Sequence, residues 1–426
     1  MGSLTRDSLN HNPPEVMHID LNSAFATIEQ QANPLLRGRP IAVAAYATPN
    51  ACILAPSIEA KVLGIKTGMR VREGRIFCPD LTVLTPDPRK YFFVHMRLRK
   101  IVNDYTSDFD PKSVDEFVIN FATSRRLNTA TLTDIGRRIK MRVRNEIGDW
   151  MRINVGIGPN RFLAKTAAGL HKPDGLDVID HTNLEDVFKT LTLTDLTGIA
   201  SRFQARLNSA NIFTPLDFLH AKRDVLVKRV FKSIVGHHWY LRLRGWEIDD
   251  IHFDRKSYGN DYAMQRPTAD IGELARLIMK LCEKTGRRLR RDSYIASGLH
   301  LWLLYNDRTT WHRGMKRPSV LYSTQDIYRA AMYVFHTQPE HKAVSKLGLA
   351  VYGIRSTEPE QLELFQTEVT RQRAIAATLD RINDKYGEFT ITPATMTGMH
   401  DLIIERVPFG STTEIPHLQG DITSML

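Results

Sequence analysis

The order of strand-like and helix-like segments in the first 170 residues constrains the fold of this chain more than any other feature. Residues 16–21 alternate in the manner of a strand, and residues 24–31 follow as a helix for which Asn22 or Ser23 offers a cap. Further along, the pattern predicts a helix at 88–105, a hairpin at 109–121, an amphipathic helix at 131–150, a strand at 153–157 and a helix at 160–170. This order predicts an α+β sheet with helices packed on one face.

The 426 residues are enough for several domains. Residues 26–86 have the pattern of a small insertion, with a strand at 41–45 and a short helix at 59–64. The segment 173–247 is basic and predicted to be helical, while 254–357 mixes helices with β-rich runs at 299–305 and 347–352. A boundary is expected at 247–254, and roughly the last 60 residues are expected to be partly mobile.

Lysine and arginine outnumber aspartate and glutamate by 58 to 47, which gives a formal net charge of +11. Such a charge favours a polyanionic partner such as nucleic acid, although an acidic membrane surface would also suit it. Against a membrane role, the sequence has no run of about 18 apolar residues and residues 1–14 form no apolar signal core. We therefore expect a cytosolic protein. Its three cysteines lack the close pairs of zinc sites or disulfide frameworks.

Three acids are predicted to lie at strand ends, since Asp20 closes one strand and Asp115 and Glu116 open another. Consecutive side chains of a regular strand point to opposite faces, but at the mouth of a hairpin both can converge. Such acids could hold two Mg²⁺ ions about 3.5–4 Å apart, an arrangement that serves phosphoryl displacement. Spacing alone leaves open that they are ordinary surface carboxylates.

Several motifs resolve this choice by resemblance. Residues 19–29 (IDLNSAFATIE), 113–117 (SVDEF) and 155–165 (VGIGPNRFLAK) closely resemble, in order, three motifs of the Y-family (DinB/UmuC-type) translesion DNA polymerases. Residues 171–175 (HKPDG) and 64–69 (GIKTGM) match two further signatures of the family, and 255–257 (RKS) resembles the entry to its fourth domain. The resemblance covers residues from about 15 to 357.

The resemblance implies a multidomain right-hand polymerase with a palm, small fingers, a helical thumb and an α/β little-finger domain. By the family pattern the palm comprises residues 1–25 and 87–172, and the fingers comprise 26–86. The thumb is expected at 173–247, the little finger at 254–357 and a C-terminal tail at 358–426. The implied activity is low-fidelity, template-directed extension of a primer, because a small fingers domain closes loosely on the nascent base pair.

Carried over by motif, the family pattern makes Asp20, Asp115 and Glu116 the ligands of two Mg²⁺ ions, for which Mn²⁺ could substitute. The Leu21 backbone carbonyl completes one metal site. Phe25 takes the steric-gate position, where an aromatic ring leaves no room for a ribose 2′-hydroxyl, and without the motif it would be interpreted as a core aromatic residue. Lys165 is expected to meet the triphosphate, and without the motif it would be interpreted as a solvated lysine.

The sequence departs from the family pattern in the fingers. There the family usually has a tyrosine and, three residues later, an arginine, whereas this chain has Ile58 and Lys61. Lysine acts as a point charge and cannot grip a phosphate with two parallel hydrogen bonds, and isoleucine has no hydroxyl group. Ala24 also replaces a residue that is commonly aromatic. We therefore expect weaker or differently shaped nucleotide binding.

Contacts with primer-template DNA are expected in the thumb and the little finger. Residues 196–200 resemble a helix-hairpin-helix element in which Gly198 would bring the backbone to a phosphate, although Ala200 replaces the usual second glycine. Two basic clusters of the little finger, Arg287, Arg288, Arg290 and Arg291 in one and residues 313–317 in the other, would follow the DNA backbone. The alternative for such a run of charge is a solvated face.

Residues 361–365 (QLELF) resemble the short peptide by which bacterial replication proteins dock on the sliding clamp. Leu364 and Phe365 would fill an apolar pocket and Gln361 would anchor the backbone, with Leu362 between them. A turn of an amphipathic helix is the alternative. The expected partners are thus DNA, deoxynucleoside triphosphates and a bacterial-type clamp, for a monomeric polymerase chain in the cytoplasm, associated with the nucleoid.

Two competing hypotheses use the same residues. At Ile58 and Lys61 the usual contacts of the fingers with the triphosphate are weakened, which would suit a non-catalytic, polymerase-shaped DNA-binding scaffold. Non-catalytic relatives tend to lose the acids, however, and the acids are intact here. A metal-dependent nuclease could be built from the same three carboxylates. It would leave Phe25 and Lys165 without a role.

Overall fold

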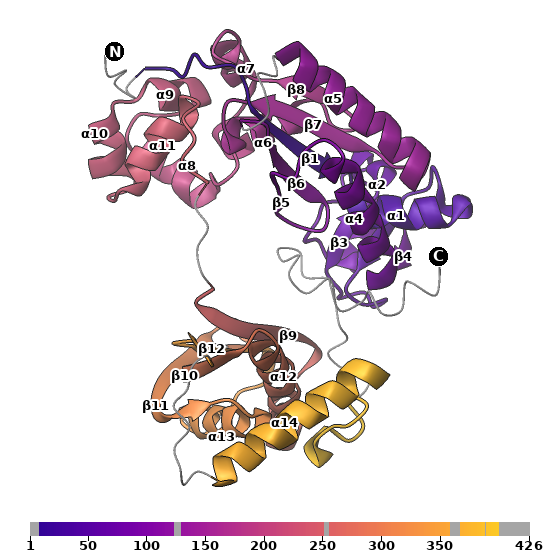
Figure 1. The fold of residues 1–426 in the computed structure, drawn as a ribbon, viewed down its shortest axis with the longest axis vertical. Helices are drawn as coiled ribbons and strands as arrows, with labels where there is room; N and C mark the ends of the chain where they lie inside the picture. The colour runs from indigo at the N-terminus through magenta and orange to yellow at the C-terminus, as the bar shows by residue number, and fades with distance from the viewer. Residues whose placement is uncertain (1–7, 123–128, 251–254, 358–366, 388, 400–426) are drawn as a thin grey trace. The chain divides into compact units, whose positions relative to one another are not determined.

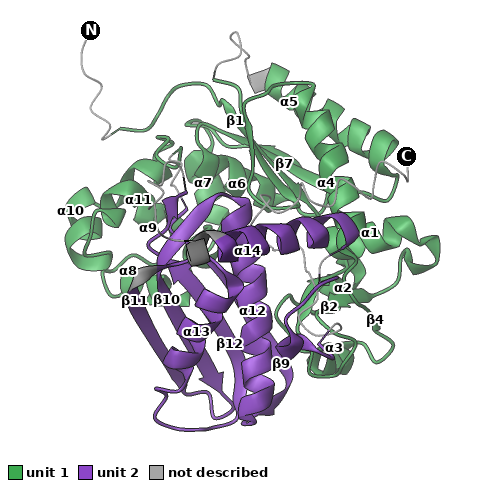
Figure 2. Cartoon of the chain, turned by 60° about the horizontal axis from the view of Figure 1, so that its bottom comes forward, with its two compact units in different colours: residues 1–251, 406–426 green, residues 252–405 purple. Residues whose placement is uncertain are grey.

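The structure is a computed structural model that describes residues 8–122, 129–250, 255–357, 367–387 and 389–399. The chain divides into two compact units, residues 1–251 with 406–426 and residues 252–405, which Figure 2 colours separately. Both units combine helices with sheets around their own buried apolar clusters. The predicted α+β, multidomain fold class is confirmed, whereas the limits of the individual domains stay a prediction.

The main sheet of the first unit has the strand order β5-β6-β1-β7-β8 (Figure 1). Its strands are β1 (Val16–Leu21), β5 (Phe109–Pro111), β6 (Glu116–Asn120), β7 (Ile153–Gly158) and β8 (Leu176–Val178). The central strand β1 is antiparallel to both β6 and β7, while β7 and β8 are parallel. The strands predicted at 16–21 and 153–157 and the hairpin predicted at 109–121 are therefore present.

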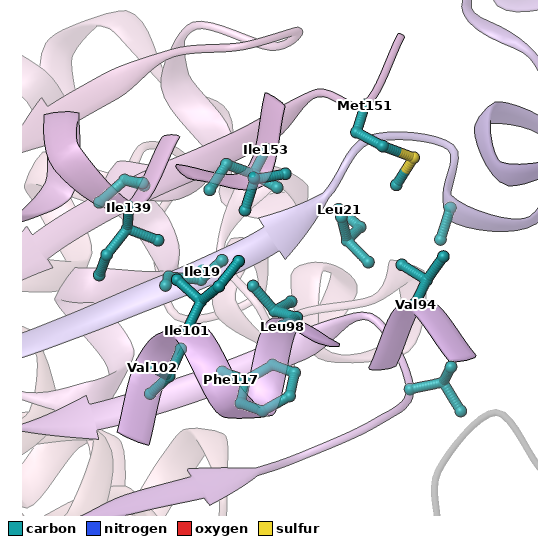
Figure 3. Packing of buried hydrophobic residues seen from close by; sticks show 14 of the residues in the cluster. Ile19, Leu21, Val94, Leu98, Ile101, Val102, Phe117, Ile139, Met151 and Ile153 are labelled. Carbon is teal, nitrogen blue, oxygen red and sulfur yellow. The ribbon is translucent and has the colours of Figure 1, made fainter. Parts of the chain in front are cut away.

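One face of this sheet is covered by α4 (Pro88–Asn103) and α5 (Thr129–Arg142). The residues of β1 that point to this face, Met17, Ile19 and Leu21, are buried because apolar side chains from both helices pack on them. Figure 3 shows Ile19 and Leu21 close to Leu98 and other apolar side chains of α4. This packing fixes the position of β1, whose end carries Asp20.

The opposite face of the sheet is covered by α6 (Arg161–Leu170), so the expectation that helices lie on one face only is wrong. Val16 points to this side and packs with Val118 and with Ala164 of α6. The helix approaches the bare backbone of β7, since a Cβ atom at Gly156 would lie 2.0 Å from the Ala164 carbonyl oxygen. Glycine in β7 thus makes room for a second helical layer.

Two helix ends differ from the prediction. The helix predicted at 131–150 is α-helical only to Arg142 and continues as one π turn, Val143–Ile147. Ser23 precedes α1 (Ala24–Ala32) but has a left-handed conformation with φ of 49° and makes no side-chain capping bond. Asn22 does not cap this helix either, because its Oδ1 accepts a hydrogen bond from the Asp174 N–H at 2.7 Å.

The rest of the first unit comprises a small sheet and a helical part. The small sheet, of order β3-β2-β4, consists of β2 (Ile41–Ala44), β3 (Ile53–Pro56) and β4 (Thr82–Leu84), with α2 (Ile58–Val62) and α3 (Val71–Phe77) beside it. The helical part consists of α7 (Leu184–Thr190), α8 (Ser201–Asn208), α9 (Pro215–His220), α10 (Arg223–Val225), the π turn Leu226–Val230 and α11 (Val235–Leu243). Each part has its own buried apolar cluster.

The second unit is a sheet of order β11-β10-β12-β9 with helices packed on it (Figure 1). Its strands are β9 (Ser257–Thr268), β10 (Tyr294–Tyr305), β11 (Thr310–Leu321), β12 (Val344–Tyr352) and the short β13 (Arg355–Ser356), and its helices are α12 (Ile271–Arg291), α13 (Thr324–Phe335) and α14 (Thr367–Tyr386). Apolar residues of α12 and α13 form one core with alternate residues of the strands.

Candidate active site

The three predicted acids gather at one end of the main sheet. Asp20 lies directly opposite Glu116 in the pairing of β1 with β6. The Leu21 N–H donates a hydrogen bond to the Asp115 carbonyl oxygen at 3.0 Å, which brings the start of the hairpin strand to the end of β1. Residues directly opposite on antiparallel strands have Cβ atoms about 4.5–5.5 Å apart. The acids are therefore neighbours, although Asp20 and Asp115 are 95 positions apart in sequence.

Each acid has a partner. The Lys165 ammonium donates to both carboxylate oxygens of Glu116, at 2.9 and 2.8 Å, and Lys172 forms an ion pair with Asp20. The Ser113 hydroxyl donates to Asp115 Oδ1 at 2.5 Å. Two lysines thus supply positive charge to the acids. Within the described residues, no three side chains of His, Cys, Asp or Glu are arranged as a metal-binding cluster.

Burial and the neighbouring lysines shift the pKa values of the acids. It raises the pKa of Asp20, against the opposing effect of Lys172, and it raises the pKa of Asp115. Burial acts in the same direction on Glu116, but the hydrogen bonds and charge of Lys165 outweigh it and lower the pKa of that carboxyl. His18, on the same face of β1, is buried and its pKa is lowered by that burial to about 4. A neutral imidazole therefore lies beside the acids at neutral pH.

A cleft of about 440 Å³ opens at this end of the sheet. Five predicted site residues line it, namely Asp20, Leu21, Phe25, Lys61 and Asp115. Lys172 and Ile58 also line it. Glu116 and Lys165 are not among the residues that line the cleft, although both are linked to it through the strand pairing and the hydrogen bonds described above.

Phe25 forms part of the cleft wall and of the core at once. Its ring stacks on that of Tyr91 with centroids 4.2 Å apart and planes 10° apart, and the residue is 4% exposed. The Tyr91 hydroxyl donates a hydrogen bond to Glu29 Oε1 at 3.0 Å, which holds the stacking partner in place. The two interpretations of Phe25 that the sequence offered are thus compatible.

Lys61 lies on the short helix α2, which begins at Ile58. Burial lowers the pKa of Lys61, and the nearby charge of Lys172 lowers it further. The two ammonium groups therefore face the same space and repel each other there. Such a pair is suited to an anionic ligand that would lie between them.

Lys172 is the lysine of the cleft lining that sequence reasoning missed. It lies in the motif 171–175, which supported the resemblance but was given no role. The structure places Lys172, and not Lys165, in the lining of the cleft, while Lys165 is engaged by Glu116. Ser113 was also missed, although its place two residues before Asp115 is the signal for a short-range side-chain hydrogen bond.

Gly198 lies in the helical part of the first unit, just before α8. Its φ is +99°, a left-handed conformation that favours glycine, and an added Cβ would lie 3.2 Å from the ring of Trp239. Glycine is therefore required by the local backbone and packing. Its contact with a DNA phosphate stays a prediction.

The arginines at the end of α12 make contacts inside the second unit. Arg290 donates two hydrogen bonds to the Asp380 carboxylate, at 2.6 and 2.8 Å, and its side chain is 4% exposed. This buried ion pair occupies the Arg290 guanidinium and does not favour the predicted contact of Arg290 with DNA, which stays a prediction. Arg287, Arg288 and Arg291 are paired with Asp384, the Gly259 carbonyl and Asp292, and their role on DNA stays a prediction.

The clamp-binding residues Gln361, Leu362, Leu364 and Phe365 lie outside the described residues, so the structure does not test them. In the part of the chain that is described, no helix has the length and apolarity needed to cross a bilayer.

Comparison with known proteins agrees with this geometry. The family model described as impB/mucB/samB family matches residues 19–169, and the model of the C-terminal domain of that family matches residues 255–364. DNA polymerase IV of Pelotomaculum thermopropionicum is 32% identical over 397 residues, which are 92% of this chain and 97% of the relative. DNA polymerase IV of Moorella thermoacetica is 33% identical over 90% of this chain and 96% of that protein.

Solved structures have the same fold. A Y-family DNA polymerase chimera matches 80% of this chain and 98% of its own with a TM-score of 0.69 at 22% identity. The insertion ternary complex of Dbh DNA polymerase matches with a TM-score of 0.54 at 21% identity, over 79% of this chain and 98% of that one. The chain belongs to the impB/mucB/samB family, the Y-family DNA polymerases of the DinB type. The right-hand polymerase fold predicted from the sequence is confirmed.

Proposed function

We propose that this protein is a template-directed DNA polymerase of the low-fidelity translesion type, which adds deoxynucleotides to a primer by phosphoryl transfer. The observation that supports this most strongly is the meeting of Asp20 and Asp115 with Phe25 and two lysines in one cleft, next to Glu116. A non-catalytic scaffold is not favoured, because the acids are intact and the relatives are DNA polymerases.

We assign two Mg²⁺ ions, with Mn²⁺ as a substitute, to Asp20, Asp115, Glu116 and the Leu21 carbonyl. The donor set fits, since all four groups are oxygen ligands of the kind that Mg²⁺ prefers. The raised pKa values of Asp20 and Asp115 express the cost of burying two neighbouring negative charges, which divalent cations would offset. When bound, two such ions stabilise the attacking and leaving oxygens of an in-line displacement.

The other cleft residues bind and orient the nucleotide. The Phe25 ring, held by its stacking on Tyr91, would lie under the sugar and exclude a 2′-hydroxyl. Lys61, Lys165 and Lys172 would meet the triphosphate as point charges, with Lys61 and Lys172 in the cleft lining. Lys165 would also orient the carboxylate of Glu116, to which it donates two hydrogen bonds.

We further propose that Gly198, Arg287, Arg288 and Arg291 hold the DNA backbone, and that residues 361–365 dock on a bacterial-type sliding clamp. The net charge of +11 supports the first proposal. In the cell, such a monomeric enzyme would act in the cytoplasm, at the nucleoid, during the repair of damaged DNA.

A primer-extension assay with Mg²⁺ and each deoxynucleotide in turn tests the activity. Extension opposite the complementary template base is the expected result. Primer-template binding without extension would identify a scaffold, and shortening of the primer would identify a nuclease. A chelator should stop extension, and added Mg²⁺ or Mn²⁺ should restore it.

The clamp proposal has its own test, with the double substitution Leu364→Ala and Phe365→Ala. Processive synthesis on a clamp-loaded template should be lost while distributive extension of a short oligonucleotide persists, because the motif lies outside the acid cleft. Equal loss of both activities would contradict the proposal and indicate a structural role.

A further inference from the structure

The ammonium group of Lys140, on α5, lies among oxygen atoms at the other end of the segment that carries Lys172. It donates hydrogen bonds to the backbone carbonyls of Asp174 at 2.5 Å, Ile153 at 3.0 Å and Gly175 at 3.1 Å, and to Asp174 Oδ1 at 2.9 Å. An ammonium group has three protons, so four acceptors satisfy it fully. Its side chain is 15% exposed, so most of it is shielded from solvent.

These contacts hold the segment 171–175, which connects α6 to β8. Two successive carbonyls, those of Asp174 and Gly175, accept from the same ammonium, which sets the orientation of both peptide groups. The Asp174 N–H donates to Asn22 Oδ1 at 2.7 Å, so the segment is also attached to the residue that follows Leu21. Asp174 has a φ of 64°, a conformation that aspartate accepts when side-chain bonds support it.

Lys172 depends on this segment for its position. Its side chain is 44% exposed, and its ammonium reaches Asp20 and lines the cleft. A long, half-exposed lysine retains much rotamer freedom, so the position of its backbone decides which volume its ammonium can reach. Lys140 contacts the two residues that come second and third after Lys172.

We infer that Lys140 is a positioning residue for nucleotide binding, which acts by holding segment 171–175 so that Lys172 faces the triphosphate. This inference rests on the proposed function, since it requires the cleft to take a nucleotide. A lysine suits the task because a compact ammonium can donate to several convergent carbonyls, whereas the flat guanidinium of arginine directs its protons along a fork.

Steady-state nucleotide incorporation by five variants tests the inference. Lys140→Met, which keeps the stem and removes the charge, should raise the KM for nucleotide roughly fivefold to tenfold with less than about a twofold change in kcat. Lys140→Arg should recover only part of this loss. In the Lys172→Ala background, Lys140→Met should raise the KM further by less than about twofold, because Lys140 acts through Lys172. Arg137→Met is the matched control, since Arg137 lies one turn away and pairs with Asp134 at the surface.

A fall in kcat without a change in KM, or a full additional effect in the Lys172→Ala background, would overturn the inference. If Lys172→Ala leaves the KM for nucleotide unchanged, the proposal that the cleft binds the nucleotide is wrong. If Lys172→Ala raises the KM but Lys140→Met does not, only the inference about Lys140 is wrong. If Lys140→Met does not fold, Asp174→Gly removes the carboxylate that Lys140 shares with Arg144, at a φ that glycine accepts. Asp174→Gly should raise the KM for nucleotide, and it should add little to the effect of Lys172→Ala. If the KM does not rise in this way, the inference is wrong.

Discussion

The acids of the first unit and the arginines of the second are both charged clusters that contain ion pairs, but the surroundings of these pairs differ. In the Lys165–Glu116 pair the side chains are 34% and 24% exposed, and the neighbouring acids border a cleft. In the Arg290–Asp380 pair they are 4% and 15% exposed. A partly exposed pair can exchange one partner for a ligand, whereas separating a buried pair leaves a charge without solvation.

A run of charge in the sequence does not by itself indicate a binding surface. The acids and the arginines were both predicted to serve function, from motifs in one case and from charge density in the other. Only the partner and its burial separate an exchangeable site from a structural contact.

The substitution Asp115→Ala, or Glu116→Ala, should have the largest effect and reduce primer extension by roughly a thousandfold. Primer-template affinity, measured by fluorescence anisotropy, should hardly change, because the basic parts of the chain hold the DNA. Asp134→Ala removes an exposed acid of the first unit and serves as the control. Robust extension by Asp115→Ala would disprove the two-metal assignment.

Arg290→Met tests the other half of the comparison. Loss of one partner of a buried ion pair should lower the free energy of unfolding by about 3–5 kcal/mol, measured by chemical denaturation. The neighbouring control Arg291→Met breaks a partly exposed pair with Asp292 and should cost less than about 1 kcal/mol. If Arg290→Met is as stable as the parent but binds DNA more weakly, Arg290 contacts DNA as the sequence predicted.

Phe25→Ala should reduce the discrimination against ribonucleotides roughly 10- to 100-fold, because the ring that excludes the 2′-hydroxyl is removed. The measurement is the ratio of kcat/KM for a deoxynucleotide and its ribonucleotide. Tyr91→Phe keeps the stacked ring and is the control for lost packing. Unchanged discrimination in Phe25→Ala would leave Phe25 as a core residue only.

The smallest effect is expected in the fingers. The double substitution Ile58→Tyr and Lys61→Arg should lower the KM for nucleotides and raise kcat/KM about tenfold, because a phenol and a guanidinium add charge-assisted hydrogen bonds. Lys61→Ala should bind nucleotide more weakly than the parent. A double variant with no gain would mean that the triphosphate meets the fingers differently, and Lys61 would lose its assigned role.

The sequence predicted the strands of the main sheet well because apolar residues alternate strongly along β1 and β7. It predicted the meeting of the acids because Asp20 and Glu116 lie at strand ends. The layer formed by α6 was missed, since its contact with β7 depends on side chains that are absent at Gly156 and Gly158. The predicted cap at Asn22 or Ser23 is absent because Ser23 has a left-handed conformation and Asn22 is bound to a residue that lies 152 positions away.

The partners of charged residues could not be predicted for a similar reason. Lys165 and Lys172 both lie in family motifs, and only the three-dimensional arrangement shows which one borders the cleft. Asp380, the partner of Arg290, is 90 residues away in a segment that the sequence predicted to be partly mobile. Local patterns indicate the type of element, but long-range pairs depend on how the elements pack.

The contact between β7 and α6 has a consequence for how this site can vary among related chains. At Gly156 and Gly158 main chain meets main chain, so the distance between the strand and the helix does not depend on side-chain size. The helix that carries Lys165 is therefore insensitive to exchanges among Ile, Val and Leu in the apolar core on the other face. Substitutions in that core can therefore accumulate while Lys165 keeps its hydrogen bonds to Glu116. A single methyl group at Gly156 would displace the helix.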